Sequence, residues 1–349
     1  MLGWLPRQRL QEGLEPTVGW YLANDDWLSA INKGEKYNKR LADNCNARGS
    51  RTGVTRMRIL LLGKNGQVGW ELERTLMPLG AVSAVDLPEV NLADADGIRR
   101  LVREARPEVI VNAAAYTAVD RAESEPDLAM AVNGLAPAIL AEEARALDSL
   151  LVHFSTDYVF DGEKRQAYVE TDLPNPINVY GKTKLAGEVG IRASGGAYLI
   201  LRTSWVYSLR GDSFVTKMLR WAREQEVVRV VNDQVASPTW ARLLAEVVAQ
   251  LIAGGIGRLH RRIGLYHLAG TGSASRFQWA ESILSLDPHP EEQRRREIVP
   301  ASSAEFPAPA RRPAFSALDC EQFASVFGLS LPGWRQSLQL ALHDVTDMD

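Results

Sequence analysis

The sequence predicts an α/β protein in which helices cover a doubly wound parallel sheet, with a smaller α/β lobe toward the C-terminus. From Met57 onward, short apolar runs alternate with helical patterns, as in repeated strand–helix–strand units. The apolar runs lack strict polar alternation, which is typical of strands that are covered on both faces. Three regularly spaced glycines separate the first run from the first helical pattern, in GKNGQVG. These observations indicate one large and one smaller folded part.

The larger part is predicted to span residues 57–224. Its expected strands are RILLLG (58–63), VSAVD (82–86), EVIVNAA (108–114), LLVHFS (150–155) and AYLILRT (197–203). Its expected helices cover residues 68–77, 93–105, 127–147, 178–193 and 214–225. Because strands and helices alternate throughout, the strands should lie parallel in one sheet.

After Gln225 the predicted elements become shorter. Strands are expected at 227–233 and 264–270, and helices at 239–254, 275–286, 319–327 and 332–343. Such a segment looks too small and mixed to continue the main sheet. We expect residues 225–349 to form mainly a small substrate-binding lobe, which closes over the carboxyl edge of the sheet, where open α/β folds bind ligands.

Charge and composition exclude several classes of partner. The formal net charge is −3, and no basic stripe with interleaved aromatic residues is present, so we expect no nucleic-acid partner. No apolar run approaches the roughly 20 residues that a transmembrane helix needs, so we expect no membrane partner. The two cysteines, Cys45 and Cys320, are far apart, which fits a reducing compartment. We therefore expect a cytoplasmic protein with a small anionic or neutral ligand.

The glycine-rich segment predicts a phosphate-binding turn. Gly63 would let the chain turn sharply, Gly66 would let backbone approach a pyrophosphate, and Gly69 would let the helix lie close to its strand. The N–H groups at the helix start would face the phosphates. The intervening Asn65, Gln67 and Val68 belong to the same expected dinucleotide site. A connecting turn without a ligand is the alternative, and the strand–turn–helix context favours the functional interpretation.

An acidic residue follows the second expected strand. Asp86 lies about 20 residues beyond the glycine turn, where a carboxylate can bind the ribose hydroxyls of NAD. An ordinary loop aspartate is the alternative. No lysine or arginine that would neutralise a 2′-phosphate is evident beside it, so the choice between NADH and NADPH stays open.

A tyrosine and a lysine one helical turn apart predict acid–base chemistry. Tyr180 and Lys184 should lie on one face of the helix in NVYGKTKLAGE. A nearby ammonium group favours the phenolate and would lower the pKa of the tyrosine, which makes it a usable proton donor. Thr156 follows the strand LLVHFS, where its hydroxyl could bind a substrate carbonyl oxygen. Solvent-exposed or strand-ending side chains are the alternative, but the three signals occur in the order expected of one reductase site.

Longer motifs extend this interpretation. The segments NAAAYTAVDRAESE, HFSTDYVFDG, NPINVYGKTKLAGE, RTSWVYS and NDQVASPT, with the glycine segment, resemble the dTDP-4-dehydrorhamnose reductase family of the extended short-chain dehydrogenase/reductase superfamily. The resemblance runs from Met57 to about Leu342. It implies a Rossmann domain and the reduction by NADPH or NADH of the C4 ketone of dTDP-4-dehydro-L-rhamnose. It also implies that Tyr180 donates the proton, Lys184 binds the nicotinamide ribose and Thr156 orients the carbonyl.

The resemblance implies further site residues. Ala113, Ala114, Tyr116 and Thr117 are expected at the cofactor, and Val119, Asp157, Tyr158 and Trp205 at the sugar nucleotide, together with Thr156 and Tyr180. Trp205 as a core aromatic is the alternative. Asn133 is expected either to anchor the site through a water molecule or merely to pack.

Three features of the sequence limit which residue roles can be carried over from the family. At the expected adenine contact, Asn91 and Leu92 stand where the family often has an aspartate before an apolar residue. Phe315 replaces the asparagine of an RPxNSxLD element in RRPAFSALD. Some members bind Mg²⁺ through glutamates at a homodimer contact, and Glu71 matches one of these. The five histidines lack ligand spacing, so a catalytic metal is not expected.

Residues 1–56 precede this match. Residues 1–40 resemble the C-terminal tail of dTDP-glucose 4,6-dehydratase, and ADNCNARGSRTGVTR is predicted to be a linker. We expect the working enzyme to begin at Met57, and a docking arm is the alternative.

Two other functions stay open from the sequence. One is a non-catalytic dinucleotide-binding regulatory subunit, and the other is a different nucleotide-sugar reductase or epimerase.

Overall fold

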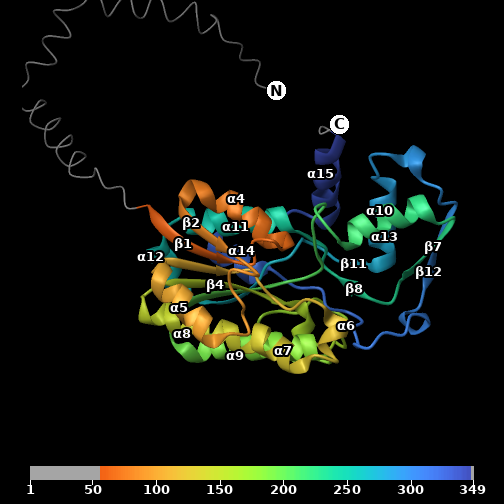
Figure 1. Cartoon of the computed structure of the whole chain (residues 1–349). Coiled ribbons are helices and arrows are strands. Elements are labelled where there is room, and N and C mark those ends of the chain that lie inside the picture. The colour runs from red at the N-terminus through yellow and green to blue at the C-terminus, as the bar shows by residue number, and fades with distance from the viewer. Residues whose placement is uncertain (1–55, 347–349) are drawn as a thin grey trace, which may run out of the picture. The chain divides into compact units, whose positions relative to one another are not determined.

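The computed structural model describes residues 56–346 and their side chains as far as residue 343. These residues belong to one compact unit, Arg56–Asp349 (Figure 1). The predictions made for residues 1–55 lie outside them.

The central sheet has six parallel strands in the order β10-β5-β4-β3-β1-β2. The strands are β1 (Met57–Leu62), β2 (Gly80–Val85), β3 (Val109–Asn112), β4 (Leu150–Thr156), β5 (Ala197–Thr203) and β10 (Gly264–His267). The first five coincide with the runs predicted between residues 58 and 203. The expectation that the chain beyond Gln225 does not continue the sheet is wrong. Leu265 and its neighbours pair with Ile200 on β5, because this apolar run can bury itself only beside the sheet's open edge.

Two layers of helices cover the sheet (Figure 1). On one face, side chains such as Leu61 and Val111 pack against α4, α11, α12 and α14, and on the other, side chains such as Leu60 and Ile110 pack against α5, α8 and α9. Alternate strand residues are therefore buried on opposite faces, as the apolar runs predict. The helices are α4 (Gln67–Leu76), α5 (Ala95–Ala105), α6 (Val119–Ala122), α7 (Pro126–Met130), α8 (Ala136–Ala146), α9 (Val179–Ser194), α11 (Ala241–Ala253), α12 (Ile256–His260) and α14 (Glu321–Phe327).

A second hydrophobic core lies beyond the sheet. It joins α10 (Phe214–Glu224), α13 (Arg276–Ser285), α15 (Trp334–Thr346) and β7 (Val227–Val231), with Trp279 fully buried in it. Placing α10 in the sheet domain, within residues 57–224, is wrong, because its apolar face packs on α13. The remaining short strands are β6 (Val206–Tyr207), β8 (Val235–Ala236), β9 (Thr239–Trp240), β11 (Ala274–Ser275) and β12 (Glu297–Ala301). The role of residues 225–349 in substrate binding stays a prediction.

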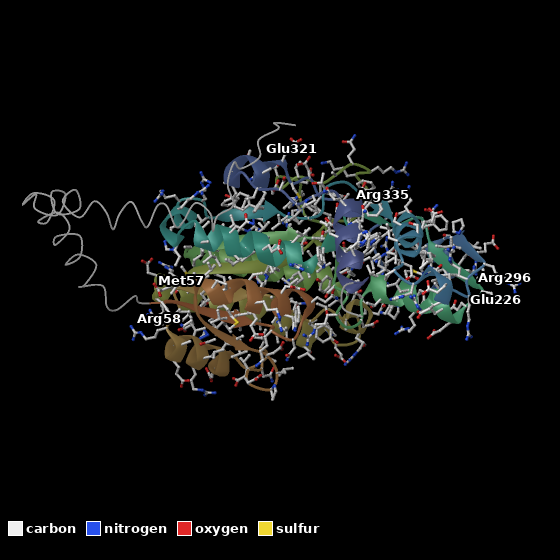
Figure 2. The ribbon with its side chains drawn as sticks, turned by 90° about the horizontal axis from the view of Figure 1, so that it is seen from above. Met57, Arg58, Glu226, Arg296, Glu321 and Arg335 are labelled. Atoms are coloured by element: carbon white, nitrogen blue, oxygen red, sulfur yellow. The ribbon has the colours of Figure 1, made fainter. Side chains whose placement is uncertain are left out.

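The start of β1 and the paired strands β7 and β12 lie on opposite sides of the described residues. Figure 2 shows Met57 and Arg58 at the start of β1 on one side, and Glu226 and Arg296, which form an ion pair of 3.5 Å beside β7 and β12, on the other. In the described part of the chain, no helix is both long and apolar enough to cross a bilayer.

Strand order places the ligand site. From β1 the chain continues to β2 on one side and later to β3 on the other, so the connections diverge at the carboxyl ends of β1 and β3. Open α/β sheets bind ligands at such a divergence. The glycine turn after β1 and the Asn112–Ala114 segment at the end of β3 therefore flank the expected crevice.

Candidate active site

The glycine turn has the geometry of a phosphate cradle. Gly63 has a left-handed φ of +89°, and a Cβ on Gly69 would lie 1.8 Å from the Gly63 carbonyl oxygen. Only glycine can occupy these two positions without moving the backbone. At the N-cap of α4, Gly66 supplies no side-chain hydrogen bond, so the first N–H groups of the helix stay available to a ligand. These features fit the pyrophosphate of a dinucleotide.

A cavity of about 750 Å³ opens at the carboxyl ends of the strands. Most of the predicted site residues line it, namely Gly63, Asn65, Gly66, Gln67, Val68, Asp86, Asn91, Leu92, Ala113, Ala114, Tyr116, Thr117, Thr156, Asp157, Tyr180, Lys184 and Trp205. Four predicted residues, Gly69, Glu71, Val119 and Tyr158, are not part of its lining. The structure thus brings the expected cofactor and catalytic groups into one cavity of ligand size.

The end of the cavity near β2 contains Asp86. Its carboxylate accepts hydrogen bonds from the backbone N–H groups of Asn65, at 3.0 Å, and Leu87, at 2.9 Å. Lys64 is the adjacent cation, and its Nζ lies 2.6 Å from the Glu89 carboxylate. Asp86 therefore ties the end of β2 to the glycine turn. Its binding to a ribose stays a prediction.

Tyr180 lies in the first turn of α9, close to Thr156 at the end of β4. Asn178 caps this helix by accepting a hydrogen bond from the N–H of Gly181 at 2.8 Å, which fixes the turn that carries the tyrosine. Burial raises the pKa of the Tyr180 phenol above its usual range, and a hydrogen bond with Thr156 offsets part of that rise. The phenol is therefore protonated near neutral pH and can act as a proton donor.

Lys184 is buried and directed at the end of β4. Its Nζ donates to the Phe154 carbonyl at 2.7 Å and lies 3.3 Å from Nε2 of His153. Burial lowers the pKa of Lys184 to about 8. The expectation that Lys184 lowers the pKa of Tyr180 is wrong in this arrangement, since burial dominates the tyrosine and the ammonium group is held by other partners. Burial and the Lys184 charge also lower the pKa of His153, and this imidazole contacts Asn112 at 3.1 Å.

The carboxylate of Asp157 is hydrogen-bonded by hydroxyl groups from three segments of the chain. Its carboxylate accepts hydrogen bonds from Thr156 at 3.2 Å, Ser204 at 3.0 Å and Ser316 at 2.5 Å. Burial raises the pKa of Asp157 to about 6, although the hydroxyl donors act in the opposite direction. The sequence analysis did not identify Ser204 or Ser316. Ser316 belongs to the RRPAFSALD element, which was the available signal.

Trp205 lines the cavity, and Tyr158 lies behind Tyr180. Trp205 has a left-handed φ of 40°, a strained conformation for a bulky residue, and its indole stacks on Trp279 with ring centroids 5.5 Å apart. Trp205 is thus both a wall of the cavity and a contact of the second core. The Tyr158 ring meets Tyr180 edge to face at 5.8 Å, one layer behind the cavity surface.

Glu71 lies among arginines. Burial raises the pKa of its carboxyl, and the charges of Arg242, Arg74 and Arg210 act in the opposite direction. A divalent cation needs several oxygen ligands and an excess of negative charge. No group of three or more His, Cys, Asp or Glu side chains within the described residues could hold a metal ion. The surroundings of Glu71 within this chain do not fit a magnesium site.

Buried polar contacts hold the catalytic helix in place. Asn133 accepts a hydrogen bond from the backbone N–H of Tyr116 at 2.8 Å and donates one to the Thr183 hydroxyl at 3.2 Å, so it connects the cofactor-side loop to α9. These direct contacts position the loop and α9, and the water-mediated role expected for Asn133 stays a prediction. Behind it, Arg202 on β5 donates two hydrogen bonds to Glu188 on α9, at 2.8 and 2.7 Å. This pair is buried and was not predicted.

Several other cavity residues were not predicted. They are Leu62, Leu87, Val90, Ala115, Leu128, Val132, Phe154, Ser155, Thr203, Val206, Arg210, Gly211 and Asp212. Thr203 ends β5 beside Thr156, and its buried hydroxyl has no hydrogen-bond partner. A hydroxyl at the carboxyl end of a predicted strand was the signal that could have identified it.

A dinucleotide cradle, a buried Tyr–Lys pair and a strand-end threonine in one cavity define an oxidoreductase of the short-chain dehydrogenase/reductase type. Similarity to known proteins narrows this class. The sequence model of one protein family, described as the RmlD substrate binding domain, matches residues 57–347. The chain belongs to the dTDP-4-dehydrorhamnose reductase family.

Relatives of that family match almost over their whole length. The dTDP-4-dehydrorhamnose reductase of Burkholderia thailandensis is 42% identical over 83% of this chain and 99% of the relative. The protein of the same name from Escherichia coli K12 is 40% identical over 83% and 98%. A crystal structure of the Bacillus anthracis reductase in complex with NADP has a TM-score of 0.76 and 34% identity, covering 83% of this chain and 99% of that one. A Thermus thermophilus UDP-glucose 4-epimerase, at 21% identity and a TM-score of 0.68, shares the fold.

Proposed function

We propose that this chain reduces the C4 ketone of dTDP-4-dehydro-β-L-rhamnose to dTDP-β-L-rhamnose, the last step of dTDP-L-rhamnose biosynthesis, with NADPH or NADH as the hydride donor. The full-length similarity to reductases of that name supports the reaction. The observation that carries it in this structure is the single cavity that joins the glycine cradle to Thr156 and Tyr180.

Each of three cavity residues has a different role in the reduction. The dinucleotide, when bound, supplies the hydride. Thr156 holds the substrate carbonyl through its hydroxyl, and Tyr180 donates its phenolic proton to the oxygen as the alcohol forms. Lys184 binds the nicotinamide ribose. Because the phenol is protonated near neutral pH, Tyr180 is ready to donate before each turnover.

The observations support binding of a nicotinamide dinucleotide, but they do not distinguish NADPH from NADH. The B. anthracis relative was solved with NADP, and the cradle of this chain fits the pyrophosphate shared by NADPH and NADH. The choice between the two stays open, as does Mg²⁺ dependence, and a homodimer and a cytoplasmic location stay predictions.

The test is ketone-dependent oxidation of NADPH and NADH at 340 nm by the wild-type enzyme and two tyrosine variants. Tyr180→Phe should lower kcat by about 10²- to 10⁴-fold, because general acid catalysis contributes that much. Tyr207→Phe is the matched control, since the buried Tyr207 hydroxyl has no hydrogen-bond partner and lies outside the cavity lining. It should leave kcat unchanged.

Two results would contradict the proposal. Equal rates in wild type and Tyr180→Phe would remove the tyrosine from the chemistry. Binding of the dinucleotide by the wild-type protein without any turnover would favour the regulatory function instead.

A further inference from the structure

A buried histidine of β4 lies between the active-site lysine and an asparagine of β3. His153 has no exposed surface, and its Nε2 lies 3.3 Å from Nζ of Lys184. On the other side of the ring, Nδ1 lies 3.1 Å from Nδ2 of Asn112, which is opposite His153 in the parallel β3–β4 pair. Each ring nitrogen therefore faces another nitrogen, and the proposed reaction gives this histidine no role.

A backbone group fixes the orientation of the Asn112 amide. Its Oδ1 accepts a hydrogen bond from the backbone N–H of Ala114 at 3.2 Å. Because a backbone N–H can only donate, the amide oxygen must face Ala114 and the NH2 group must face His153. An amide NH2 group is a donor only, so Nδ1 of His153 must be the acceptor. In a neutral imidazole the proton then lies on Nε2.

The His153 imidazole is kept neutral by its surroundings. Burial and the charge of Lys184 lower the pKa of His153 well below its usual range. An imidazolium would also place an Nδ1–H against the NH2 group of Asn112, where no acceptor is present. The Nε2–H group of a neutral ring therefore points at Lys184.

This Nε2–H group needs an acceptor, and only one form of Lys184 supplies it. An ammonium group has three N–H donors and no lone pair, so with charged Lys184 two donors would meet. The uncharged amine accepts the N–H of His153 with its lone pair and still donates to the Phe154 carbonyl at 2.7 Å. One N–H then remains for a ligand in the cavity, which Lys184 lines.

A second buried histidine shows the opposite arrangement. Nδ1 of His267 lies 3.0 Å from the Tyr168 carbonyl oxygen and 3.2 Å from that of Asp319. Carbonyl oxygens only accept, so Nδ1 carries the proton, and the lone pair of Nε2 faces the Arg202 guanidinium at 3.5 Å. A lone pair toward a cation is the favourable arrangement. The reverse arrangement at His153 follows from its asparagine neighbour.

Other groups around Lys184 act in both directions. Burial favours its uncharged form and lowers the pKa of Lys184 to about 8, whereas the negative charge of Glu188 favours the ammonium form. Glu188 is itself held by two hydrogen bonds from Arg202 and one from the Ser155 hydroxyl. Tyr180 adds no charge, since burial keeps its phenol protonated. The histidine contact therefore acts together with burial, against Glu188.

We propose that His153, held by Asn112 as the Nε2–H tautomer, is a positioning residue that donates to Lys184, favours its uncharged amine and leaves one lysine N–H for the nicotinamide ribose. The contact with the ribose rests on the proposed function, whereas the tautomer and the titration of Lys184 do not. Ribose hydroxyl groups are neutral, so an uncharged amine can bind them without a cation being kept in a buried site.

Nuclear magnetic resonance of the full chain tests the tautomer and the titration separately. Two-bond nitrogen–proton spectra of 15N-histidine show which ring nitrogen carries the proton in His153 and in His267. The Cε shift of 13C-labelled Lys184, followed as the pH is varied, measures the pKa of that lysine. The kcat for ketone reduction is measured over the same pH range.

Two variants are compared with wild type. Asn112→Leu removes the amide that selects the tautomer and introduces no charge. Ser149→Ala is the matched control, because the buried Ser149 hydroxyl donates to the Pro107 carbonyl at 2.6 Å, at the other end of the β3–β4 pair. Each variant removes a buried polar side chain, but only Asn112→Leu removes a contact of His153.

Wild type should show the proton on Nε2 of His153 and on Nδ1 of His267. In Asn112→Leu, the freed imidazole can turn a lone pair toward the ammonium group, so the pKa of Lys184 should rise by about 1 or more. Added apolar burial alone would lower this pKa, so the direction distinguishes the two causes. The inflection of kcat that follows Lys184 should move to higher pH, and Ser149→Ala should behave as wild type.

Several results overturn the inference. One is a proton on Nδ1 of His153 in wild type, which needs no variant to observe. Others are an unchanged or lower pKa of Lys184 in Asn112→Leu, an equal rise in Ser149→Ala, and a kcat profile that stays in place while that pKa moves.

The two proposals fail separately. If wild type reduces the ketone but His153 carries its proton on Nδ1, only this inference fails. If His153 and Lys184 titrate as expected but wild type does not reduce the ketone, only the proposed reaction fails.

Discussion

Asp157 shows how one carboxylate can organise a site from distant parts of the chain. Its hydroxyl donors come from β4, from the segment after β5 and from residue 316, so three segments meet at one buried group. Beside it, Thr156 and Tyr180 face the cavity. The protonation state of Asp157 therefore affects both the packing and the polarity of the substrate pocket.

The raised pKa of Asp157 predicts a pH dependence of stability. Because the folded protein binds this proton more tightly than the unfolded chain, the stabilisation is complete below the unfolded pKa near 4 and is lost as the pH rises through about 6. Asp157→Asn lacks the titrating group. The difference in free energy of unfolding, wild type minus variant, should therefore fall by up to about 3 kcal/mol between pH 4 and pH 7. Urea unfolding at several pH values measures it.

Asp161→Asn is the control, because the pH dependence of its effect on the free energy of unfolding should have the opposite sign. A backbone hydrogen bond from Glu163 and contacts with Asn175 and Tyr168 lower the pKa of Asp161, so its stabilisation is lost as the pH falls. The wild-type minus variant difference should rise with pH for this residue. A flat or rising difference for Asp157→Asn would mean that burial does not control its titration.

At the scale of the element, the turn between β1 and α4 depends on two different kinds of glycine. Gly69 is required by packing, because its Cα approaches the Gly63 carbonyl so closely that no Cβ fits. Gly66 has an ordinary φ of −74°, and a Cβ there would meet its nearest atom, the Gly63 carbonyl oxygen, at 3.4 Å. It lines the cavity, so any added carbon narrows the space for a ligand.

Alanine variants should separate these two roles. Gly69→Ala should lower the free energy of unfolding by about 1–3 kcal/mol and weaken NADPH binding, since the helix must move away from the strand. Gly66→Ala should weaken NADPH binding while changing the free energy of unfolding by less than about 0.5 kcal/mol. Denaturant unfolding and calorimetry measure the two effects. A Gly69→Ala variant as stable as wild type would show that the turn can relax.

The catalytic helix depends on contacts that connect layers. Asn178 caps α9, Glu188 pairs with Arg202 on β5, and Asn133 lies in a five-residue π-helix, Ala131–Leu135, that joins α7 to α8. Short π-helices occur often at functional sites. Here the π-helix turns Asn133 toward Thr183 on α9, so the cofactor-side loop and the catalytic helix keep one arrangement.

At the scale of the whole molecule, the chain crosses repeatedly between its two cores. α10 leaves the sheet layers to join the second core, α11 and β10 return to the sheet, and α13 and α15 complete the second core. Leu243 connects the cores directly, since it packs against buried residues of both. Trp205 joins the second core to the cavity, since it lines the cavity and stacks on Trp279. Neither core is formed by one continuous stretch of the chain.

This interleaving predicts a single unfolding transition. Trp279→Ala in the second core should destabilise the protein by about 3–5 kcal/mol, and Leu72→Ala, under the sheet, by about 2–5 kcal/mol. Both should shift one calorimetric transition to lower temperature without splitting it, because unfolding either core removes strands or helices of the other. Two separated transitions in wild type or in Trp279→Ala would show that the cores unfold independently.

Much of the sheet and of the cofactor side was predictable from local sequence. Strand runs, the glycine turn and the spacing of Tyr180 and Lys184 depend on residues a few positions apart, whose steric and periodic effects are visible in the sequence. The pKa of Tyr180 was not predictable, because it depends on which groups surround the phenol. Ser316 and Thr203 were missed for the same reason, since each becomes part of the site only through packing.

By itself, the sequence determined that residues from Met57 onward form a parallel α/β sheet with a dinucleotide turn and a Tyr–Lys helix, because alternation, glycine spacing and helical periodicity act over short distances along the chain. The tertiary structure decided the rest. It placed β10 beside β5, moved α10 into the second core and turned Lys184 toward the Phe154 carbonyl. These outcomes depend on burial and charge between segments far apart in sequence, where only the packed fold sets the distances.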